Sequence, residues 1–325
     1  MQHILLRNGV EMPQIGLGTF LIPNDKLTDI IGRAYALGYR QFDTAWRYFN
    51  EQHISEALRA NGIKREEVFI TTKVNADGLY WGGYKYGLHR YFNIRNFKSI
   101  ERIIQESFDN LQTDYIDLFL IHWPWPITPR IWLELSRLYC QGRIRAIGVS
   151  NFLQPHLEAL SEFSDIKPAV NQFEISPLNT QKELIAYCQQ HGIAVEAMST
   201  FSHYRSVKPR LEILQNSTLQ CIAEKYDKSV AQIVLRWLLQ QNIIMIPKTW
   251  NEEHLRENIS ILDFELSAQD MSEIDSLDRG KFLNYNPYCA QEGLPSKYKR
   301  WEGFQEWNKY YQPSGFSKFL HKMLP

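Results

Sequence analysis

Strand-like and helix-like segments alternate along this chain, and that order constrains the fold more than any other feature of the sequence. Short apolar runs typical of buried strands occupy residues 14–19, 39–44, 68–74, 116–122, 144–150, 169–175, 194–198 and 243–248. Segments with apolar residues three or four positions apart lie between them, as in amphipathic helices. Such alternation favours βα units and a parallel sheet. Eight regularly spaced units fit an α/β fold of the (β/α)8 TIM barrel type better than an open, doubly wound sheet.

Three segments fall outside this alternation. A β-hairpin precedes the first strand, with Asn8 and Gly9 placed as a two-residue type I′ turn. A long, aromatic-rich loop follows the third strand at residues 75–97, and an extended, aromatic-rich tail follows Gly280. We therefore predict a single barrel over residues 1–280. The tail, residues 281–325, is predicted to fold over the mouth or the side of that barrel.

The composition excludes several classes of function. A chain of 325 residues is long enough for one large barrel or two average domains. Its formal net charge is zero, so no overall field attracts nucleic acid or an acidic membrane. No apolar run reaches the roughly 18 residues that a membrane span needs, and the amino-terminal residues turn polar too soon for a secretory signal. We expect a cytoplasmic protein that binds neither nucleic acid nor membrane.

The cysteines support the same expectation. Cys140, Cys188, Cys221 and Cys289 are widely separated, in a spacing typical neither of a disulfide framework nor of a metal site. We predict buried, reduced thiols and no bound metal.

Four polar residues stand at the ends of three neighbouring strands. Asp43 ends the second strand and Tyr48 lies in the loop after it, while Lys73 ends the third strand and His122 the fourth. In a βα barrel the active site forms at the carboxyl ends of the strands. Taken singly, each residue has a bland explanation, such as a solvated charge, a turn cap or a structural histidine. Together, at neighbouring strand ends, they favour a catalytic site.

The chemistry of these four side chains fits proton transfer to a carbonyl group. A tyrosine has a pKa of about 10, too high for efficient donation near neutral pH, and a neighbouring ammonium lowers it. A carboxylate beside the lysine keeps the lysine charged, and an imidazole orients the reacting carbonyl. Such a set suits proton donation to a carbonyl oxygen while a hydride reaches its carbon, and this acid catalysis contributes about 10²–10⁴ in rate.

Several motifs resemble those of the aldo-keto reductase family over about residues 5–280. The motifs in question are Gly16-Leu17-Gly18-Thr19, Phe42-Asp43-Thr44-Ala45, Thr72-Lys73-Val74, His122-Trp123-Pro124, Gly148-Val149-Ser150-Asn151-Phe152, Asn171-Gln172 and Ile246-Pro247-Lys248. The resemblance implies a monomeric, NAD(P)H-dependent reductase of a small-molecule carbonyl. It makes Tyr48 the acid, Lys73 the modulator of its pKa and Asp43 the partner of that lysine. His122 would orient the carbonyl.

The same resemblance implies a cofactor site, and the aromatic residues near the predicted mouth suggest a substrate wall. The implied cofactor contacts are Gly18, Thr19, Ser150, Asn151, Gln172, Met198, Ser199, Lys248, Thr249, Trp250, His254, Glu257 and Asn258. The predicted substrate contacts are Phe20, Trp46, Arg47, Phe49, Trp81 and Trp123. Arg47 either meets an anionic substrate group or pairs with Glu51.

Two positions depart from the family's pattern at the cofactor. Met198 stands where many relatives stack a tyrosine on the nicotinamide, and a thioether offers no aromatic face. His254 stands where NADPH-selective relatives carry an arginine that clamps the 2′-phosphate. A histidine is mostly neutral near pH 7 and does not offer the guanidinium fork. We predict that the chain uses NADPH with a relaxed preference, so that NADH is accepted as well.

The aromatic-rich loop and tail favour a deep pocket for a bulky, cyclic or aromatic carbonyl, although a tail packed on the barrel's side would need the same residues. Two other functions remain open. One is a cofactor-binding regulatory or scaffold protein of this fold with little turnover. The other is a lyase or isomerase on the same barrel, which would need neither Lys248 nor the pair Ser150 and Asn151.

Overall fold

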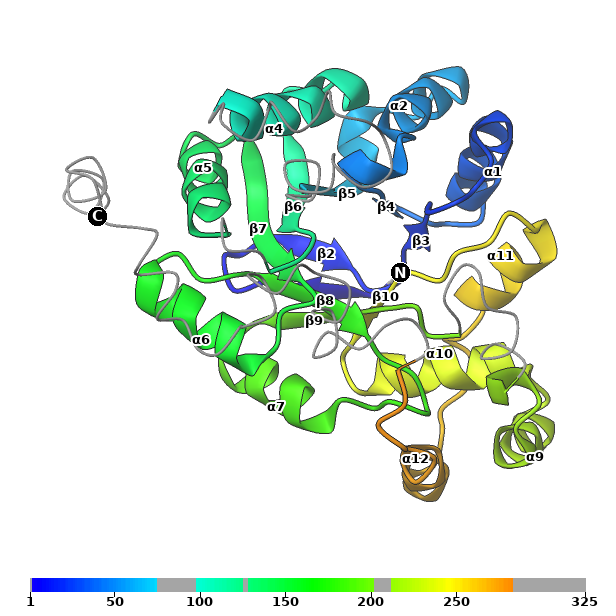
Figure 1. Cartoon of the computed structure of the whole chain (residues 1–325). Coiled ribbons are helices and arrows are strands. Elements are labelled where there is room, and N and C mark those ends of the chain that lie inside the picture. Colours follow the sequence, from blue (N-terminus) through cyan, green and yellow to red (C-terminus); the bar gives the residue numbers. More distant parts are fainter. Residues whose placement is uncertain (1, 75–97, 125–127, 202–211, 283–325) are drawn as a thin grey trace, which may run out of the picture.

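The computed structural model describes residues 2–74, 98–124, 128–201 and 212–282, in which helices surround a parallel sheet of eight strands (Figure 1). The strands are β1 (His3–Leu5), β2 (Glu11–Pro13), β3 (Leu17–Gly18), β4 (Gln41–Asp43), β5 (Phe69–Val74), β6 (Ile116–Ile121), β7 (Ile144–Ser150), β8 (Val170–Glu174), β9 (Ala194–Met198) and β10 (Ile244–Met245). The sheet runs from β3 to β10 in chain order, so each strand pairs with the next one along the chain.

Helices follow the strands of this sheet and cover its outer face (Figure 1). The helices are α1 (Asn24–Ala36), η1 (Trp46–Tyr48), α2 (Glu51–Ala60), η2 (Arg65–Glu67), α4 (Lys98–Leu111), α5 (Thr128–Cys140), α6 (Gln154–Phe163), α7 (Lys182–Gln190), α9 (Ser217–Tyr226), α10 (Val230–Gln240), α11 (Glu252–Ile259) and α12 (Ala268–Asp275). Ser229 and Gln232 form a reciprocal cap at the start of α10, with backbone-to-side-chain bonds of 3.0 and 3.2 Å.

The sheet closes into a barrel where the first strand meets the last. The Gly16 N–H donates to the Met245 carbonyl at 2.8 Å, and the Met245 N–H donates to the Gln14 carbonyl at 2.9 Å. A third bond joins the Gly18 N–H to the Pro247 carbonyl at 3.3 Å. These bonds confirm the predicted closed (β/α)8 barrel.

The seam strands β3 and β10 are shorter than the predicted runs of residues 14–19 and 243–248. Pro247 has no N–H to give to a ladder, so regular pairing of β10 ends before it. The remaining contacts at the seam are the isolated bridge of Ile15 with Met245 and the bonds named above.

The amino-terminal hairpin is present, but the predicted turn type is wrong. A type I′ turn needs positive φ at both central residues, and here Gly9 has a φ of 82° whereas Asn8 is not among the residues of positive φ. The Leu6 N–H donates to the Val10 carbonyl at 2.8 Å, which closes a three-residue loop. The Asn8 amide nitrogen donates to the Arg145 carbonyl at 2.8 Å, and this contact with β7 fixes the longer turn.

The hairpin fills one end of the barrel with apolar side chains. Ile4, Leu6 and Met12 pack in one buried cluster with inward residues of the barrel strands, among them Leu118 and Ile244. A second, larger cluster lies between the sheet and the helices. The hairpin thus covers the amino ends of the strands, and Asp43 and Lys73 lie toward the carboxyl ends.

The prediction that the cysteines are buried is wrong for two of them. Cys188 is buried, but Cys140 on α5 and Cys221 on α9 are exposed, because both lie on the solvent-facing sides of their helices. Cys289 lies outside the described residues, as do the long loop at 75–97 and residues 283–325 of the tail.

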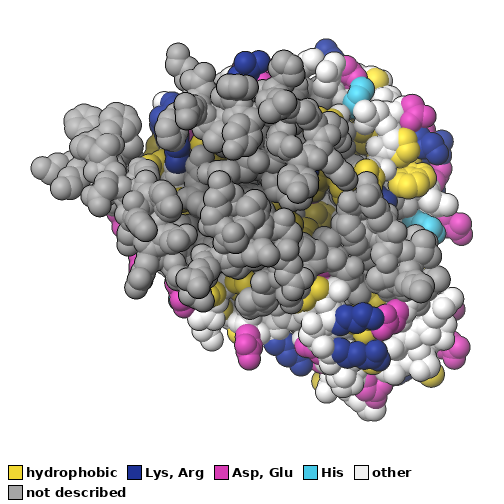
Figure 2. Space-filling model, in the orientation of Figure 1, with side chains coloured by type: hydrophobic (Ala, Val, Ile, Leu, Met, Phe, Trp, Pro, Cys, Tyr) yellow, Lys and Arg dark blue, Asp and Glu magenta, His cyan; other side chains and the backbone are white. Residues whose placement is uncertain are grey.

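The described helices and surface show neither a membrane span nor a metal-binding cluster. Among the described helices, none combines the length and the apolar character that a membrane span requires. Figure 2 shows basic and acidic side chains next to one another along the described rim of the face in view, in keeping with a formal net charge of zero. The same described residues contain no cluster of three or more His, Cys, Asp or Glu side chains arranged to hold a metal ion.

Candidate active site

A buried ion pair lies at the carboxyl ends of β4 and β5. The Lys73 ammonium donates to both carboxylate oxygens of Asp43, at 2.6 and 2.7 Å, and to the Thr44 carbonyl at 2.9 Å. Lys73 is fully buried and Asp43 is 2% exposed. Burial alone would lower the pKa of Lys73, but the charge of Asp43 raises it above the usual value. The lysine therefore remains an ammonium at neutral pH.

Tyr48 ends the short helix η1 and faces this ammonium. Its ring centroid lies 5.2 Å from the Lys73 Nζ atom and 4.5 Å from the Phe20 ring. Burial raises the pKa of Tyr48, and Lys73 opposes that increase, which is the effect expected from the sequence. Burial outweighs the lysine, so the pKa lies above the usual tyrosine value and the phenol carries its proton at neutral pH.

Hydrogen bonds on both sides of η1 fix the position of Tyr48. The Thr44 hydroxyl donates to the Asn50 side-chain oxygen at 2.6 Å, and the Asn50 amide donates to the Thr19 carbonyl at 3.1 Å. The buried Glu51 carboxylate accepts a bond of 2.6 Å from the Thr72 hydroxyl. Since these contacts reach β3, β4 and β5, the loop that carries Tyr48 is anchored to three strands.

His122 completes the group immediately after β6. The backbone N–H of His122 donates to the Val74 carbonyl at 2.9 Å. The imidazole ring lies edge-on to the Tyr48 ring, with the two centroids 5.8 Å apart. Burial lowers the pKa of His122 well below its usual value, and the charges of Lys73 and Arg47 lower it further. The imidazole is therefore neutral at pH 7. Its Nδ1 is buried without a hydrogen-bond partner among the described residues, which suits a tautomer with its proton on Nε2.

The side-chain amides of Asn151 and Gln172 lie beside this group, and their nitrogens donate hydrogen bonds to other protein atoms. The Asn151 amide nitrogen donates to the His122 carbonyl and to the Ser150 hydroxyl oxygen, both at 3.1 Å. The Gln172 amide nitrogen donates to Asp43 at 3.0 Å. An amide bound in this way presents its carbonyl oxygen to a ligand, and the Ser150 hydroxyl retains its proton as a donor. Two acceptors and one donor match a primary carboxamide such as that of nicotinamide.

Sequence reasoning missed one buried carboxyl in this region. Glu196 is fully buried, faces inward on β9 and is the register partner of Gln172 on β8. It accepts bonds of 2.7 Å from the amide nitrogens of both Gln172 and Gln41. The available signal was a single carboxylate inside an apolar strand, two residues before Met198 and therefore on the same face.

The remaining cofactor candidates lie around the ends of β3, β9 and β10. Met198 and Ser199 follow one another at the end of β9, and Ser199 has a φ of 54°. A Cβ at Gly18 would lie 2.8 Å from the Ile246 carbonyl oxygen, so only glycine allows this approach. Thr19 is buried and donates its hydroxyl proton to the Asp43 carbonyl at 2.8 Å.

The segment between β10 and α11 brings a cation and an aromatic ring together. The Lys248 Nζ atom lies 4.4 Å from the centroid of Trp250, which is 42% exposed. The buried Thr249 accepts the Asn251 N–H at 3.1 Å. His254 is exposed in the first turn of α11, while Glu257 is half-buried and Asn258 is buried farther along that helix.

The predicted substrate residues occupy different environments. Phe20 lies against Tyr48, and Trp123 stacks beside His122 with ring centroids 6.4 Å apart, so both flank the catalytic group. The Trp46 indole donates to Glu106 on α4 at 3.1 Å, which turns it toward that helix. Phe49 is 67% exposed, Arg47 is exposed, and Trp81 lies outside the described residues.

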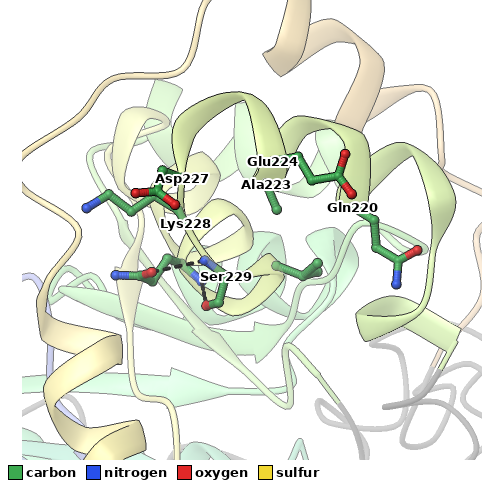
Figure 3. A pocket seen from close by; sticks show the side chains of 8 residues that line it. Gln220, Ala223, Glu224, Asp227, Lys228 and Ser229 are labelled. Atoms are coloured by element: carbon green, nitrogen blue, oxygen red, sulfur yellow. Dashed lines mark hydrogen bonds between the residues drawn. The ribbon is translucent and has the colours of Figure 1, made fainter.

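A depression of about 560 Å³ lies elsewhere, between α9 and α10 (Figure 3). The hydrogen bonds drawn there are the reciprocal cap of Ser229 and Gln232. Glu224, Asp227 and Lys228 line the depression from the end of α9. The hydrogen bonds among its lining residues therefore cap α10, and the polar group at the strand ends is the candidate active site.

Comparisons with known proteins agree with this geometry. Residues 14–279 match the model of the aldo/keto reductase family. Glyoxal reductase of Bacillus subtilis is 43% identical over 87% of this chain and 95% of its own length, and morphine 6-dehydrogenase of Pseudomonas putida is 37% identical over 87% and 94%. A crystal structure of a Bombyx mori aldo-keto reductase in complex with NADP is similar, with a TM-score of 0.76 and 30% identity over 91% of this chain and 98% of that one. This chain therefore belongs to the aldo-keto reductase family and is an oxidoreductase.

Proposed function

We propose that this chain reduces an aldehyde or ketone to an alcohol with NADPH as the cofactor and Tyr48 as the proton donor. The observation that carries the proposal is the buried ion pair of Asp43 and Lys73 beside a protonated Tyr48. A neutral His122 lies next to the Tyr48 ring. These side chains supply an acid, a charge that stabilises its conjugate base, and a neutral donor for the carbonyl oxygen.

The protein's own part in the reaction is to place and move one proton. NADPH, when bound, supplies the hydride that reduces the carbonyl carbon. The Tyr48 hydroxyl transfers its proton to the carbonyl oxygen, so that the product is a neutral alcohol. The Lys73 ammonium stabilises the phenolate that remains, and Asp43 holds that ammonium in place. The Nε2–H of His122 donates to the carbonyl oxygen and fixes its direction.

The side chains present fit the nicotinamide cofactor. Asn151 and Gln172 offer carbonyl oxygens to the carboxamide nitrogen, and Ser150 offers its hydroxyl proton to the carboxamide oxygen. Lys248 and the first turn of α11 suit the phosphate of NADPH. Because His254 lacks the arginine fork, the preference for NADPH over NADH is relaxed.

The substrate we propose is a bulky, cyclic or aromatic carbonyl. Phe20 and Trp123 support it, since their aromatic rings flank Tyr48 and His122 and lie beside the reacting atoms. Related proteins bear the names glyoxal reductase and morphine 6-dehydrogenase, so a test has to include small dicarbonyls as well as large ring ketones. Deletion of the tail from Tyr285 should change substrate selectivity more than NADPH affinity, and unchanged kinetics across that range would contradict a pocket built with the tail.

The experiment is a fluorescence titration of the purified protein with NADPH and with NADH, followed by steady-state oxidation with a panel of aldehydes and ketones. We expect micromolar NADPH binding, turnover on several carbonyls and measurable activity with NADH. Tight binding without turnover on any member would favour a regulatory protein of the same fold. A preference for NADPH above about a thousandfold, roughly 4 kcal/mol, would contradict the relaxed cofactor site.

A further inference from the structure

Three polar side chains form a hydrogen-bonded chain across the interior of the barrel, next to the Asp43–Lys73 pair. Gln41 donates to one oxygen of Glu196 and Gln172 donates to the other, each at 2.7 Å. The same Gln172 nitrogen donates to Asp43 at 3.0 Å, which links the chain to Lys73. Gln41, Gln172 and Glu196 are at most 1% exposed, so solvent does not screen the charge of Glu196.

Gly16 leaves the space that the hydrogen-bonded side chains Gln41, Glu196 and Gln172 need inside the barrel. A Cβ at that position would lie 2.7 Å from Cδ and 2.8 Å from Cγ of Gln41. The missing side chain therefore lets Gln41 extend to Glu196 on β9. A carboxyl buried here is consequently part of a matched set of residues on four different segments and is not an isolated polar residue.

We propose that Glu196 is a positioning residue whose carboxyl gains and loses a proton inside the closed barrel and thereby sets the pH range over which Tyr48 acts as an acid. This role rests on the carbonyl reduction proposed above. Among the described residues, the charged or titratable groups that act on Glu196 include Asp43 on β4, Lys73 on β5 and Tyr48 on η1. Its amide partners come from β4 and β8. On β10, its register partner is the apolar Ile244.

Both charge states of Glu196 find hydrogen-bond partners. A carboxylate only accepts, and the two amide nitrogens satisfy it. A protonated carboxyl needs an acceptor, and the Gln41 oxygen is buried without a hydrogen-bond partner among the described residues. A half-turn of the Gln41 amide brings that oxygen to the carboxyl, while Gln172 stays bound to Asp43. Gain or loss of the proton therefore requires no opening of the barrel wall.

The charge of Glu196 acts on the catalytic acid with a defined sign. Burial, and then the charge of Asp43, raise the pKa of Glu196 to about 7. Above that pH the ionised carboxyl raises the pKa of Tyr48. Tyr48 accordingly keeps its proton to a higher pH than it would beside a neutral residue, and reduction extends farther into the basic range.

The first test compares Glu196→Gln with the unchanged protein. The substitution preserves size, and its amide can donate to the Gln41 oxygen and accept from Gln172, so chiefly the charge is lost. We expect the basic limb of the pH profile of kcat to move to lower pH by about half a unit to one unit, as for a unit charge across a protein interior. The KM for NADPH should change less than about threefold. An unmoved limb would overturn the proposal.

Asp117→Asn is the matched control. Asp117 is also buried, but it lies near the amino ends of the strands and accepts hydrogen bonds from Arg65, Arg145 and the Ile70 N–H. Its substitution should leave the position of the basic limb unchanged, whatever it does to stability. A movement as large as that of Glu196→Gln would show a general effect of buried carboxyls and would overturn the assignment.

A second measurement needs no turnover. The folded protein retains the Glu196 proton up to about pH 7, whereas the unfolded chain releases it near the usual glutamate pKa of 4.5. Stability is therefore lost as the pH rises through this window, and Glu196→Gln should not lose it. Urea unfolding of both proteins across the window tests this. If Glu196 titrates but the protein reduces no carbonyl, the reductase function and the role of Tyr48 are both overturned. If the protein reduces carbonyls but Glu196 does not titrate in this window, only the Glu196 proposal is overturned.

Should Glu196→Gln not fold, Gln41→Met answers the same question. Methionine keeps the volume beside Gly16 but removes one donor to the ionised Glu196. The carboxyl then holds its proton more tightly, so the loss of stability with rising pH should extend to higher pH than in the unchanged protein. Identical pH dependence in the two proteins would contradict the proposal.

Discussion

Each end of the barrel contains a buried carboxylate bound to basic side chains, and the two ends use different bases. At the carboxyl ends of the strands, Asp43 is bound by Lys73, which is fully buried. Near the amino ends, Asp117 accepts bonds of 2.6 Å from both Arg65 and Arg145, whose side chains are 18% and 46% exposed, and a bond of 2.9 Å from the Ile70 N–H.

The difference separates a structural ion pair from a chemical one. An arginine is always charged and its fork holds a carboxylate rigidly, so Asp117 serves to tie β5, β6 and β7 together. A lysine shifts its pKa with its surroundings, and Lys73 lies next to Tyr48, Glu196 and His122, which titrate as well. Burial of an ion pair is therefore no sign of catalysis by itself, whereas contact with further titratable groups is.

Removal of the lysine should have the largest effect. Lys73→Met leaves Asp43 buried without its counter-charge, which should lower the free energy of unfolding by about 3–5 kcal/mol. Turnover should fall at least about a hundredfold, because nothing stabilises the tyrosinate. Urea unfolding and kcat measure the two effects. Adding Asp43→Asn should recover stability without recovering turnover; recovery of both would show that the pair is only structural.

The equivalent change at the other end should affect stability alone. Asp117→Asn weakens the bonds to Arg65 and Arg145, and we expect a loss of about 1–3 kcal/mol in the free energy of unfolding. The value of kcat/KM, measured well below the unfolding transition, should stay within about threefold of that of the unchanged protein. A fall in kcat/KM comparable with that of Lys73→Met would contradict the division between the two ends.

The pH dependence of stability gives a third, smaller distinction. The pKa of His122 in the folded protein lies well below its usual 6.5, so only the unfolded chain takes up a proton as the pH falls below that value. His122 should therefore contribute a loss of stability with falling pH, of about 1 kcal/mol between about pH 7.5 and about pH 5.5, against the opposite contribution of Glu196 over the same range. In His122→Asn this loss is absent, so the stability of the variant should rise more steeply as the pH falls. A slope equal to that of the unchanged protein would assign the dependence to other groups.

The exposed rim of the catalytic end should respond least. His254→Arg adds a permanent charge and a fork in the first turn of α11, where the 2′-phosphate of NADPH is proposed to bind. We expect the ratio of kcat/KM for NADPH to that for NADH to rise about three- to tenfold, with little change in kcat. A ratio that does not rise would show that His254 does not meet the phosphate.

The strand ends were the part of the site that the sequence indicated well. Periodic apolar runs ended at Asp43, Lys73 and His122, and closure of the barrel brings such ends together. The predictions for β7 and β9 agree with the observed bounds, because each strand has an apolar face and a clear boundary. The seam strands and the hairpin turn were predicted less well, since tertiary contacts at Met245 and Arg145 decide them.

Glu196 shows what periodicity does not reveal. A strand with one inward carboxylate has nearly the same pattern as a wholly apolar one, and its partners Gln41 and Gln172 are far away in the sequence. The turned-away position of Trp46 likewise depends on Glu106, a residue of another helix. The exposed thiols of Cys140 and Cys221 were missed because residue type alone, rather than helix face, was used to place them.

The most direct test of the account is Tyr48→Phe, which removes one hydroxyl and leaves the Asp43–Lys73 pair intact. NADPH affinity, measured by fluorescence titration, should stay within about threefold, and kcat for any reducible carbonyl should fall at least about a hundredfold. That result would make Tyr48 the proton donor of a reductase. Turnover within about tenfold of the unchanged enzyme would contradict it, because the proton would then have another source.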